Sequence, residues 1–128
     1  MYSQIVLDIF NNPKNAGSLA GANGVGKVGN MQCGDIMKIY LLIEGDIVRD
    51  AKFKTFGCVA AIASSNMMCD LVRGKTIEQA QGVSNAEVVT ALGGLPPQKV
   101  HCSVLAKEAV ESAVVDYKKR LERAQKKV

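Results

Sequence analysis

The sequence predicts an α+β protein in which a three-stranded antiparallel sheet packs with helices and a long helix ends the chain. Apolar and polar residues alternate over 37–44 and again over 50–55, on either side of a Gly45-Asp46 turn, as in a β-hairpin. Good helix formers fill 58–72, and apolar residues recur at helical spacing after Ser103. Because 128 residues suffice for one core, we expect a single domain over 1–128.

The chain opens with a short amphipathic helix and a glycine-rich stretch. The apolar face of the helix consists of Tyr2, Ile5, Val6, Ile9 and Phe10. Asn11, Asn12 and Pro13 end this helix. The glycines that follow do not match a phosphate-binding loop, because no Gly-Lys-Ser/Thr follows them and no strand precedes them. We interpret this stretch as a loop with a weak first strand near Val25–Gly29.

Each strand of the hairpin has one face suited to burial. In the first strand this face is Met37, Ile39, Leu41 and Ile43. In the second strand Ala51, Phe53 and Thr55 share one face, and Asp50, Lys52 and Lys54 share the other. The pattern therefore predicts a sheet with one buried side.

Four helices are predicted after the hairpin. The first covers 58–72 and stops near Gly74, and each of the next two opens with a capping box. The two boxes are Thr76 with Gln79 and Ser84 with Glu87. The last helix begins at about Ser103 and carries two i,i+4 ion pairs, Asp116–Arg120 and Glu122–Lys126. Its expected buried stripe is Ala106, Ala109, Val110, Ala113, Tyr117, Leu121 and Ala124.

Composition excludes several classes of protein. The net charge of +4 is mild, and much of the positive charge lies near the C-terminus. A solvent-exposed helix end accounts for this charge, so we expect no nucleic-acid partner. Apolar runs are far shorter than the ~20 residues that span a bilayer, and no signal peptide opens the sequence. We therefore expect a cytoplasmic protein without membrane association. Four cysteines in such a protein favour metal or thiol chemistry over disulfides.

Three of the cysteines lie where irregular segments meet regular elements. Cys33 precedes the first hairpin strand, Cys58 follows the second, and Cys102 begins the last helix. An antiparallel hairpin places the start of one strand beside the end of the next, so we expect Cys33 and Cys58 to lie close together. Gly34 allows a backbone turn that would point Asp35 toward the same place.

The segment from Leu95 to Ser103 carries the single histidine. Pro96 and Pro97 stiffen it and exclude a helix interior, and they are followed by His101 and Cys102 at the predicted helix start. A helix N-terminus favours thiolate over thiol, which suits a metal-binding or reactive cysteine.

The fourth cysteine, Cys69, is predicted to fill the core. It follows Cys58 by eleven positions on one helix, which corresponds to ~16 Å, whereas a metal–sulfur bond is ~2.3 Å.

The candidate ligands are thiolates, an imidazole and a carboxylate, and they leave three hypotheses open. Thiolates and imidazole suit zinc or an iron–sulfur cluster, and a hard carboxylate would hold a cluster loosely, as in a protein that builds a cluster and gives it away. A closed structural zinc site could use the same ligands. A thiol enzyme would use Cys102 as nucleophile and His101 as base, although neighbouring residues at a helix start usually point apart.

The chain resembles the iron–sulfur cluster assembly scaffold family, the IscU proteins and the N-terminal domain of NifU. The likeness covers nearly the whole chain and rests on a combination of motifs. These are Asn12-Pro13-Lys14-Asn15, Gly29-Asn30, Cys33-Gly34-Asp35, Phe53-Lys54-Thr55-Phe56-Gly57-Cys58, Ala61-Ile62-Ala63-Ser64-Ser65, Gly74-Lys75-Thr76 and 92–103.

The resemblance implies a scaffold that receives sulfur as persulfide from a cysteine desulfurase, assembles a transient [2Fe-2S] cluster with cellular iron, and transfers it to apo-proteins. It implies ligands from Cys33, Cys58 and Cys102, with His101 or Asp35 able to contribute, and zinc able to occupy the same site. Cys102 would accept the persulfide, and Asp35 would make the cluster labile. Such a protein is an assembly scaffold rather than a turnover enzyme.

The resemblance also concerns partners and shows departures from the family pattern. Leu95–Lys99 is similar to the family's chaperone-recognition motif, but Gln98 replaces a valine. Val59 stands where the family usually has glycine, and Ile9 where many relatives have histidine. Both a monomer and a homodimer remain open.

Overall fold

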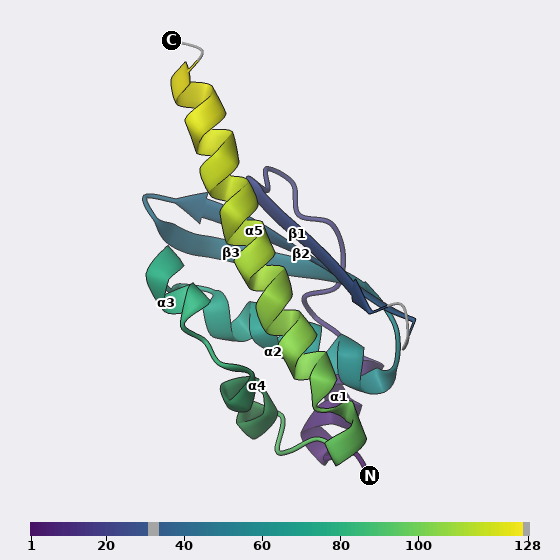
Figure 1. Cartoon of the computed structure of the whole chain (residues 1–128). Coiled ribbons are helices and arrows are strands. Elements are labelled where there is room, and N and C mark those ends of the chain that lie inside the picture. The colour runs from purple at the N-terminus through teal and green to yellow at the C-terminus, as the bar shows by residue number, and fades with distance from the viewer. Residues whose placement is uncertain (31–33, 127–128) are drawn as a thin grey trace.

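The computed structural model describes residues 1–30 and 34–126, and its helices pack on one side of an antiparallel sheet (Figure 1). The elements are α1 (Gln4–Asn11), β1 (Gly24–Asn30), β2 (Asp35–Glu44), β3 (Ile47–Phe56), α2 (Val59–Val72), α3 (Ile77–Gln81), α4 (Asn85–Ala91), a 3-10 turn η1 (Pro97–Lys99) and α5 (His101–Lys126). This arrangement confirms the predicted α+β fold with its long C-terminal helix.

The sheet has the order β1-β2-β3, and both neighbouring pairs are antiparallel. Gly45 and Asp46 have φ of 57° and 63°, the positive values that a two-residue hairpin turn requires. The predicted apolar face of β2 is buried, with Met37, Ile39 and Leu41 all at 0% exposure. The alternation of the sequence therefore identified the side of the sheet that faces the helices.

The sequence predicts β1 only weakly because the strand contains glycines, and these glycines allow α5 to pack almost against its backbone. A Cβ on Gly26 would collide with the α5 backbone at Ala109 and Ala113, and one on Gly24 would meet the carbonyl oxygen of Ala113 at 2.7 Å. Glycine is therefore required here for close packing, although it lowers the strand propensity.

α2 forms the centre of the core, and the segments around it follow the sequence signals. Cys69 has 0% exposure, and burial raises the pKa of its thiol well above the ordinary value, as expected of a cysteine that fills the core. Both predicted capping boxes are present, at Thr76 with Gln79 and at Ser84 with Glu87. No helix within the described part of the chain is both long and apolar enough to cross a membrane.

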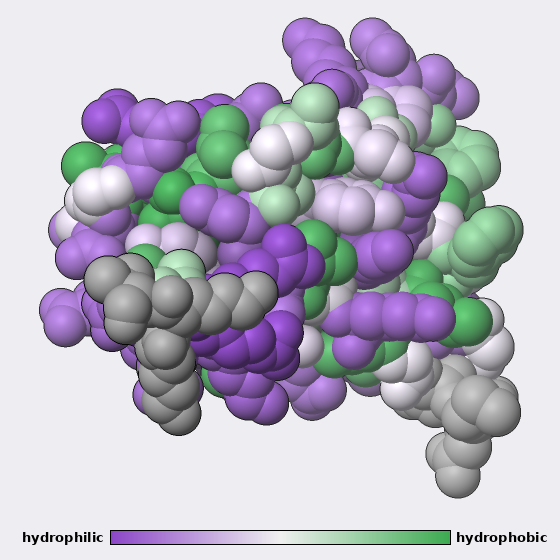
Figure 2. All heavy atoms as spheres, turned by 90° about the horizontal axis from the view of Figure 1, so that it is seen from above, coloured by the Kyte–Doolittle hydropathy of each residue, from purple (hydrophilic) through white to green (hydrophobic). Residues whose placement is uncertain are grey.

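Two predicted apolar faces are less buried than expected. In α1 only Val6 is buried, whereas Ile5 and Phe10 are 45% and 42% exposed. In α5 the stripe is buried from Ala106 to Ala113, but Leu121 is 44% exposed because the helix continues beyond the end of the sheet (Figure 1). Seen from above, hydrophilic residues are interspersed with smaller groups of hydrophobic residues over the visible surface (Figure 2).

The remaining predictions for α5 concern its start, its last turns and its ion pairs. The helix begins at His101, two residues earlier than predicted, and Ala124 is exposed. Arg120 Nε lies 3.0 Å from Asp116 Oδ2, which confirms one ion pair. The Glu122–Lys126 pair lies outside the described residues, because the side chain of Lys126 is not described.

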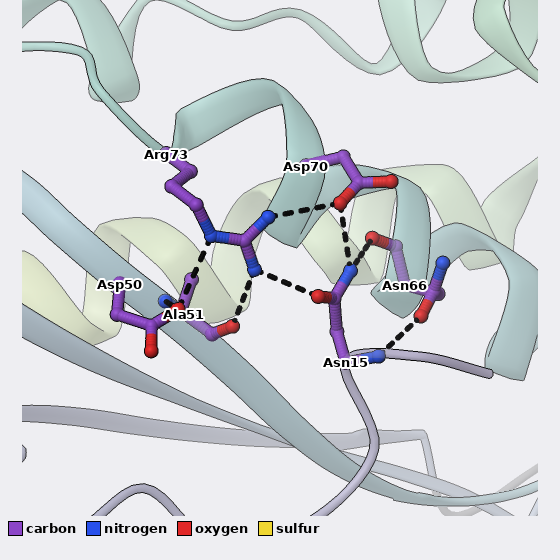
Figure 3. A network of polar contacts seen from close by, with 6 residues as sticks. All are labelled: Asn15, Asp50, Ala51, Asn66, Asp70 and Arg73. Atoms are coloured by element: carbon purple, nitrogen blue, oxygen red, sulfur yellow. Dashed lines mark hydrogen bonds and ion pairs between the residues drawn. The ribbon is translucent and has the colours of Figure 1, made fainter.

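A polar network fixes the loop after α1 to α2 and β3 (Figure 3). The Asn15 side-chain amide donates to Asn66 O and Asp70 Oδ1 at 2.9 Å each, and its oxygen accepts from Arg73 Nη2 at 2.7 Å. Arg73 also donates to Asp50 at 3.1 Å and to the Ala51 carbonyl at 2.9 Å. The network therefore connects three segments that are distant in the sequence.

Candidate metal centre

Asp35 is the first residue of β2 and points to the helix side of the sheet. Its side chain is only 4% exposed. The register pairs Ile36 with Phe56, which places Asp35 beside Gly57. A Cβ on Gly57 would collide with the Asp35 carboxylate, so the missing side chain of Gly57 provides the space that this carboxylate occupies.

The Cys58 and Cys102 thiols come from the N-terminal ends of two helices. Cys58 is the N-cap residue of α2, and its side chain makes no capping bond. Cys102 lies in the first turn of α5 and is fully buried. The two sulfur atoms are 3.8 Å apart, and Cys102 Sγ is 3.7 Å from Asp35 Oδ2. Both helix ends therefore deliver a thiol to the buried carboxylate.

His101 lies at the outer side of this group. Its Nε2 is 3.7 Å from Cys102 Sγ and 3.7 Å from Asp35 Oδ2, and its side chain is 34% exposed. The expectation that the side chains of His101 and Cys102 point apart was wrong, because both contact the Asp35 carboxylate. The imidazole thus contacts both the buried thiol and the buried carboxylate while remaining partly exposed.

These atoms have the spacing of a metal site. One ligand atom from each of Asp35, Cys58 and Cys102 lies within 4.8 Å of the others. Two thiolates bound ~2.3 Å from one tetrahedral ion lie ~3.8 Å apart, which equals the 3.8 Å distance between Cys58 Sγ and Cys102 Sγ. A buried carboxylate is also costly unless it is paired or binds a metal. The donor set therefore fits a thiophilic metal or a cluster.

The local electrostatics differ from the expectation for a helix N-terminus. Burial, followed by the neighbouring Cys58 and Asp35, raises the pKa of Cys102 well above the ordinary thiol value. Burial and these neighbours therefore oppose the preference for thiolate that a helix N-terminus favours. A bound cation would reverse this balance and displace the proton.

The other predicted site residues are placed as follows. Cys33 lies outside the described residues. Leu95–Lys99 is accessible, with Pro97 and Gln98 exposed, and this segment leads into α5 through η1. Val59 packs against the core beside Cys58.

Sequence reasoning did not identify Gly57 as part of the site. The sequence did contain an indication, since Gly57 directly follows the predicted strand and directly precedes the candidate ligand Cys58. Only the strand register shows that it faces Asp35.

Comparison with known proteins places this geometry in a family. Residues 1–124 match the family model described as the NifU-like N terminal domain. The iron–sulfur cluster assembly scaffold protein IscU 1 of Archaeoglobus fulgidus is 52% identical over 117 residues, covering 91% of this chain and 76% of the relative. The IscU scaffold protein of Rickettsia prowazekii is 46% identical over 125 residues, covering 94% and 95%.

Solved structures show the same fold. A putative iron–sulfur cluster assembly scaffold protein for the SUF system from Fervidobacterium islandicum has a TM-score of 0.73 at 30% identity, covering 88% of this chain and 95% of that one. The N-terminal part of a NifU-like protein from Brucella abortus has a TM-score of 0.71 at 20% identity, with 91% and 94% covered. The chain thus has the fold of iron–sulfur assembly scaffolds. It belongs to the NifU-like N-terminal domain family, which confirms the resemblance noted in the sequence.

Proposed function

We propose that this chain is a scaffold on which an iron–sulfur cluster is assembled and from which it is transferred to apo-proteins. The observation that carries the proposal is the convergence of Asp35, Cys58 and Cys102, with their ligand atoms within 4.8 Å of one another. Relatives that carry the scaffold name cover most of this chain at 46–52% identity, which supports the same reading.

We assign each residue a role in handling the cargo. Cys58 and Cys102 would bind iron as thiolates, with Cys33 as a further thiolate and His101 as an additional donor. Asp35 would supply a hard oxygen ligand, which binds an iron–sulfide unit less firmly than a thiolate does and so favours release. The cargo in this proposal is a [2Fe-2S] cluster, and zinc is a competing occupant of the same ligands.

Sulfur would arrive as a persulfide. The Cys102 thiolate would attack the terminal sulfur of the donor persulfide, forming Cys102–S–SH and releasing the donor thiolate. Reduction of that sulfur to sulfide then needs two electrons from an external reductant. Because Cys102 has 0% exposure, sulfur delivery requires a rearrangement that exposes its thiol. A cysteine desulfurase is the class of partner that this step needs.

We propose an assembly scaffold rather than a turnover enzyme. The relatives that match most of this chain carry the name of assembly scaffolds, which supports this proposal. The family resemblance of Leu95–Lys99 suggests a chaperone as a further partner, and the exposure of Gln98 is compatible with such contact. A single domain and a cytoplasmic location remain predictions.

Anaerobic reconstitution with iron, cysteine and a cysteine desulfurase tests the proposal. We expect visible sulfide-to-iron charge-transfer absorption, near-equal iron and sulfide, and transfer of the cluster to an apo-ferredoxin. Cys102→Ser is expected to retain the fold but lose sulfide incorporation. A colourless protein that retains one zinc ion and accepts no sulfide would instead indicate a structural zinc site on this fold.

A further inference from the structure

The face of the sheet that points away from α2 and α5 carries lysines in strict register. Lys27 of β1 pairs with Lys38 of β2, and Lys38 pairs with Lys54 of β3. These three positions alternate with the buried residues of each strand, so they share the outer face. Lys27 and Lys54 are exposed and Lys38 is half-buried. The three side chains therefore form a row across the whole sheet.

This row is unfavourable for the fold taken alone, because like charges directly opposite each other destabilise a sheet. Within the described residues no ion pair joins Lys27, Lys38 or Lys54 to an acidic side chain. Asp50 lies on the same face, but its carboxylate binds Arg73 at 3.1 Å. Packing of the chain itself does not account for three adjacent positive charges.

The positive character extends around Tyr40. Lys52 pairs with Tyr40 in the register, and the Lys38 ammonium lies 5.1 Å from the centroid of the Tyr40 ring. Slight burial opposes ionisation of the phenol, but a hydrogen bond from Lys38 and the charges of Lys38 and Lys54 outweigh it and lower the pKa of Tyr40. A hydrogen bond with Ser18, in the loop before β1, acts on the pKa of Tyr40 in the same direction as Lys38.

An apolar pair separates the lysines from the candidate metal centre. Ile36 pairs with Phe56 on the outer face, and their exposed fractions are 39% and 76%. Phe56 borders a groove of ≈ 290 Å³ whose walls include Pro13, Ala16 and Ile62. Asp35 and Cys58 lie one and two residues beyond this pair. Along the strands, the outer face thus changes from positive charge to exposed apolar surface at the sheet end whose helix side carries the candidate metal centre.

We propose that this face, made of Lys27, Lys38, Lys54, Ile36 and Phe56, docks an acidic protein partner that exchanges cargo with the metal centre. The inference rests on the proposed scaffold function. The lysine row complements an acidic surface, and Ile36, Phe56 and the adjoining groove offer the apolar anchor typical of a protein interface. A nucleic-acid backbone would use the lysines but leave this apolar anchor unfilled, so we favour a protein.

Replacing Lys38 by an acidic residue should affect the stability of the fold and the binding of a partner in opposite directions. Lys38→Glu would place an acid between two lysines, so we expect its melting temperature to rise by about 2–5 °C. Binding should change in the opposite direction. With a small apo-ferredoxin of acidic surface as the probe, we expect Lys38→Glu/Lys54→Glu to lower the association rate constant about tenfold at low salt. The wild-type rate should fall with added salt, whereas the rate of the variant should change little.

Lys118→Glu/Lys119→Glu on the exposed end of α5 is the matched control, with the same change in net charge. Equal losses in both variants, or wild-type association by Lys38→Glu/Lys54→Glu, would overturn the proposed face. The proposal would also be overturned if duplex DNA bound to the chain through Lys38 and Lys54 while the association of ferredoxin did not depend on these lysines. Binding is measured on the metal-free chain, and iron and sulfide loading separately, so failure of docking is distinguished from failure of the scaffold function.

Discussion

At the scale of single residues, the candidate metal centre depends on Gly57 as well as on the side chains that would bind the cargo. Gly57 does not need a positive φ, so its role is to leave space. The Asp35 carboxylate occupies that space and lies 3.7 Å from both Cys102 Sγ and His101 Nε2. A residue with no functional group therefore sets the position of a proposed ligand.

Gly57→Ala should weaken metal binding without unfolding the protein. The added methyl group would displace the Asp35 carboxylate and would also lie 3.1 Å from Ala61 Cβ. Changes that disturb a ligand from outside typically lower metal affinity by ~10–100-fold, and we expect a loss in this range for zinc, measured by competition with a chromophoric chelator. Gly82→Ala is the control, because its Cβ would make only ordinary contacts. Equal zinc affinity in wild type and Gly57→Ala would contradict this role.

The buried thiols connect residue chemistry to stability. The pKa values of Cys69 and Cys102 are raised in the folded chain, first of all by burial, whereas an unfolded thiol titrates near pH ~8.5. Above that pH the unfolded chain loses these protons and the folded chain retains them. The stability that the thiols contribute is therefore complete below pH ~8.5 and is lost as the pH rises.

Cys69→Ala should flatten this pH dependence in the metal-free protein. Each such thiol can lower the free energy of unfolding by up to ~1.4 kcal/mol per pH unit above pH ~8.5, so removing Cys69 should remove about that much of the slope. Urea titrations between pH 7 and pH 10 provide the measurement, and the lysines titrate equally in both proteins. An unchanged slope would show that Cys69 ionises as freely in the folded state as in the unfolded one.

At the scale of elements, the loop between α1 and β1 is fixed by specific hydrogen bonds. Asn15 is 6% exposed and its backbone pairs with Phe53, where Phe53 N donates to Asn15 O at 2.9 Å. Hydrogen bonds to Asp70 and Asp50 outweigh the opposing effect of burial and raise the pKa of Arg73, so this residue is charged at any working pH. The loop therefore pairs with the sheet edge at Phe53 and forms one wall of the groove that Phe56 borders.

Asn15→Ala should destabilise the protein by about 2–4 kcal/mol. It removes three side-chain hydrogen bonds and leaves buried groups of Asn66, Asp70 and Arg73 with fewer partners. Asn12→Ala is the control, because Asn12 is exposed. Urea unfolding of the two variants measures the difference, and a loss below about 1 kcal/mol for Asn15→Ala would show that the network contributes little net stability.

Element boundaries show what local patterns can and cannot predict. Alternation and capping boxes identified β2, β3, α3 and α4 because these signals arise within a few residues. β1 gave a weak signal because its glycines serve contact with α5, a partner almost ninety positions away. Burial of Leu121 was predicted wrongly, because periodicity continues along α5 after the sheet beneath it has ended.

At the scale of the whole molecule, the candidate site joins the start of β2, the start of α2 and the start of α5. The sequence alone predicted that Asp35, Cys58 and Cys102 lie close together, because each lies where a loop meets a strand or a helix. An antiparallel hairpin places the start of β2 beside the end of β3, which brings Asp35 near Cys58. The full burial of Cys102 was not predictable, since it depends on tertiary contacts with Cys58 and Asp35 from other elements. The lysine row required the register between all three strands.

Release of cargo is the property that separates a scaffold from a permanent cluster protein. We propose that Asp35, which is buried and 3.7 Å from Cys102 Sγ, would supply the weak ligand that permits release. The most direct test is the decay of visible absorption of the reconstituted protein under a chelator, comparing wild type with Asp35→Ala and with Asp8→Ala on the exposed face of α1. We predict that the cluster persists several-fold longer in Asp35→Ala and that Asp8→Ala behaves as wild type. Faster loss of the cluster in Asp35→Ala would contradict the assignment and make Asp35 a stabilising ligand instead.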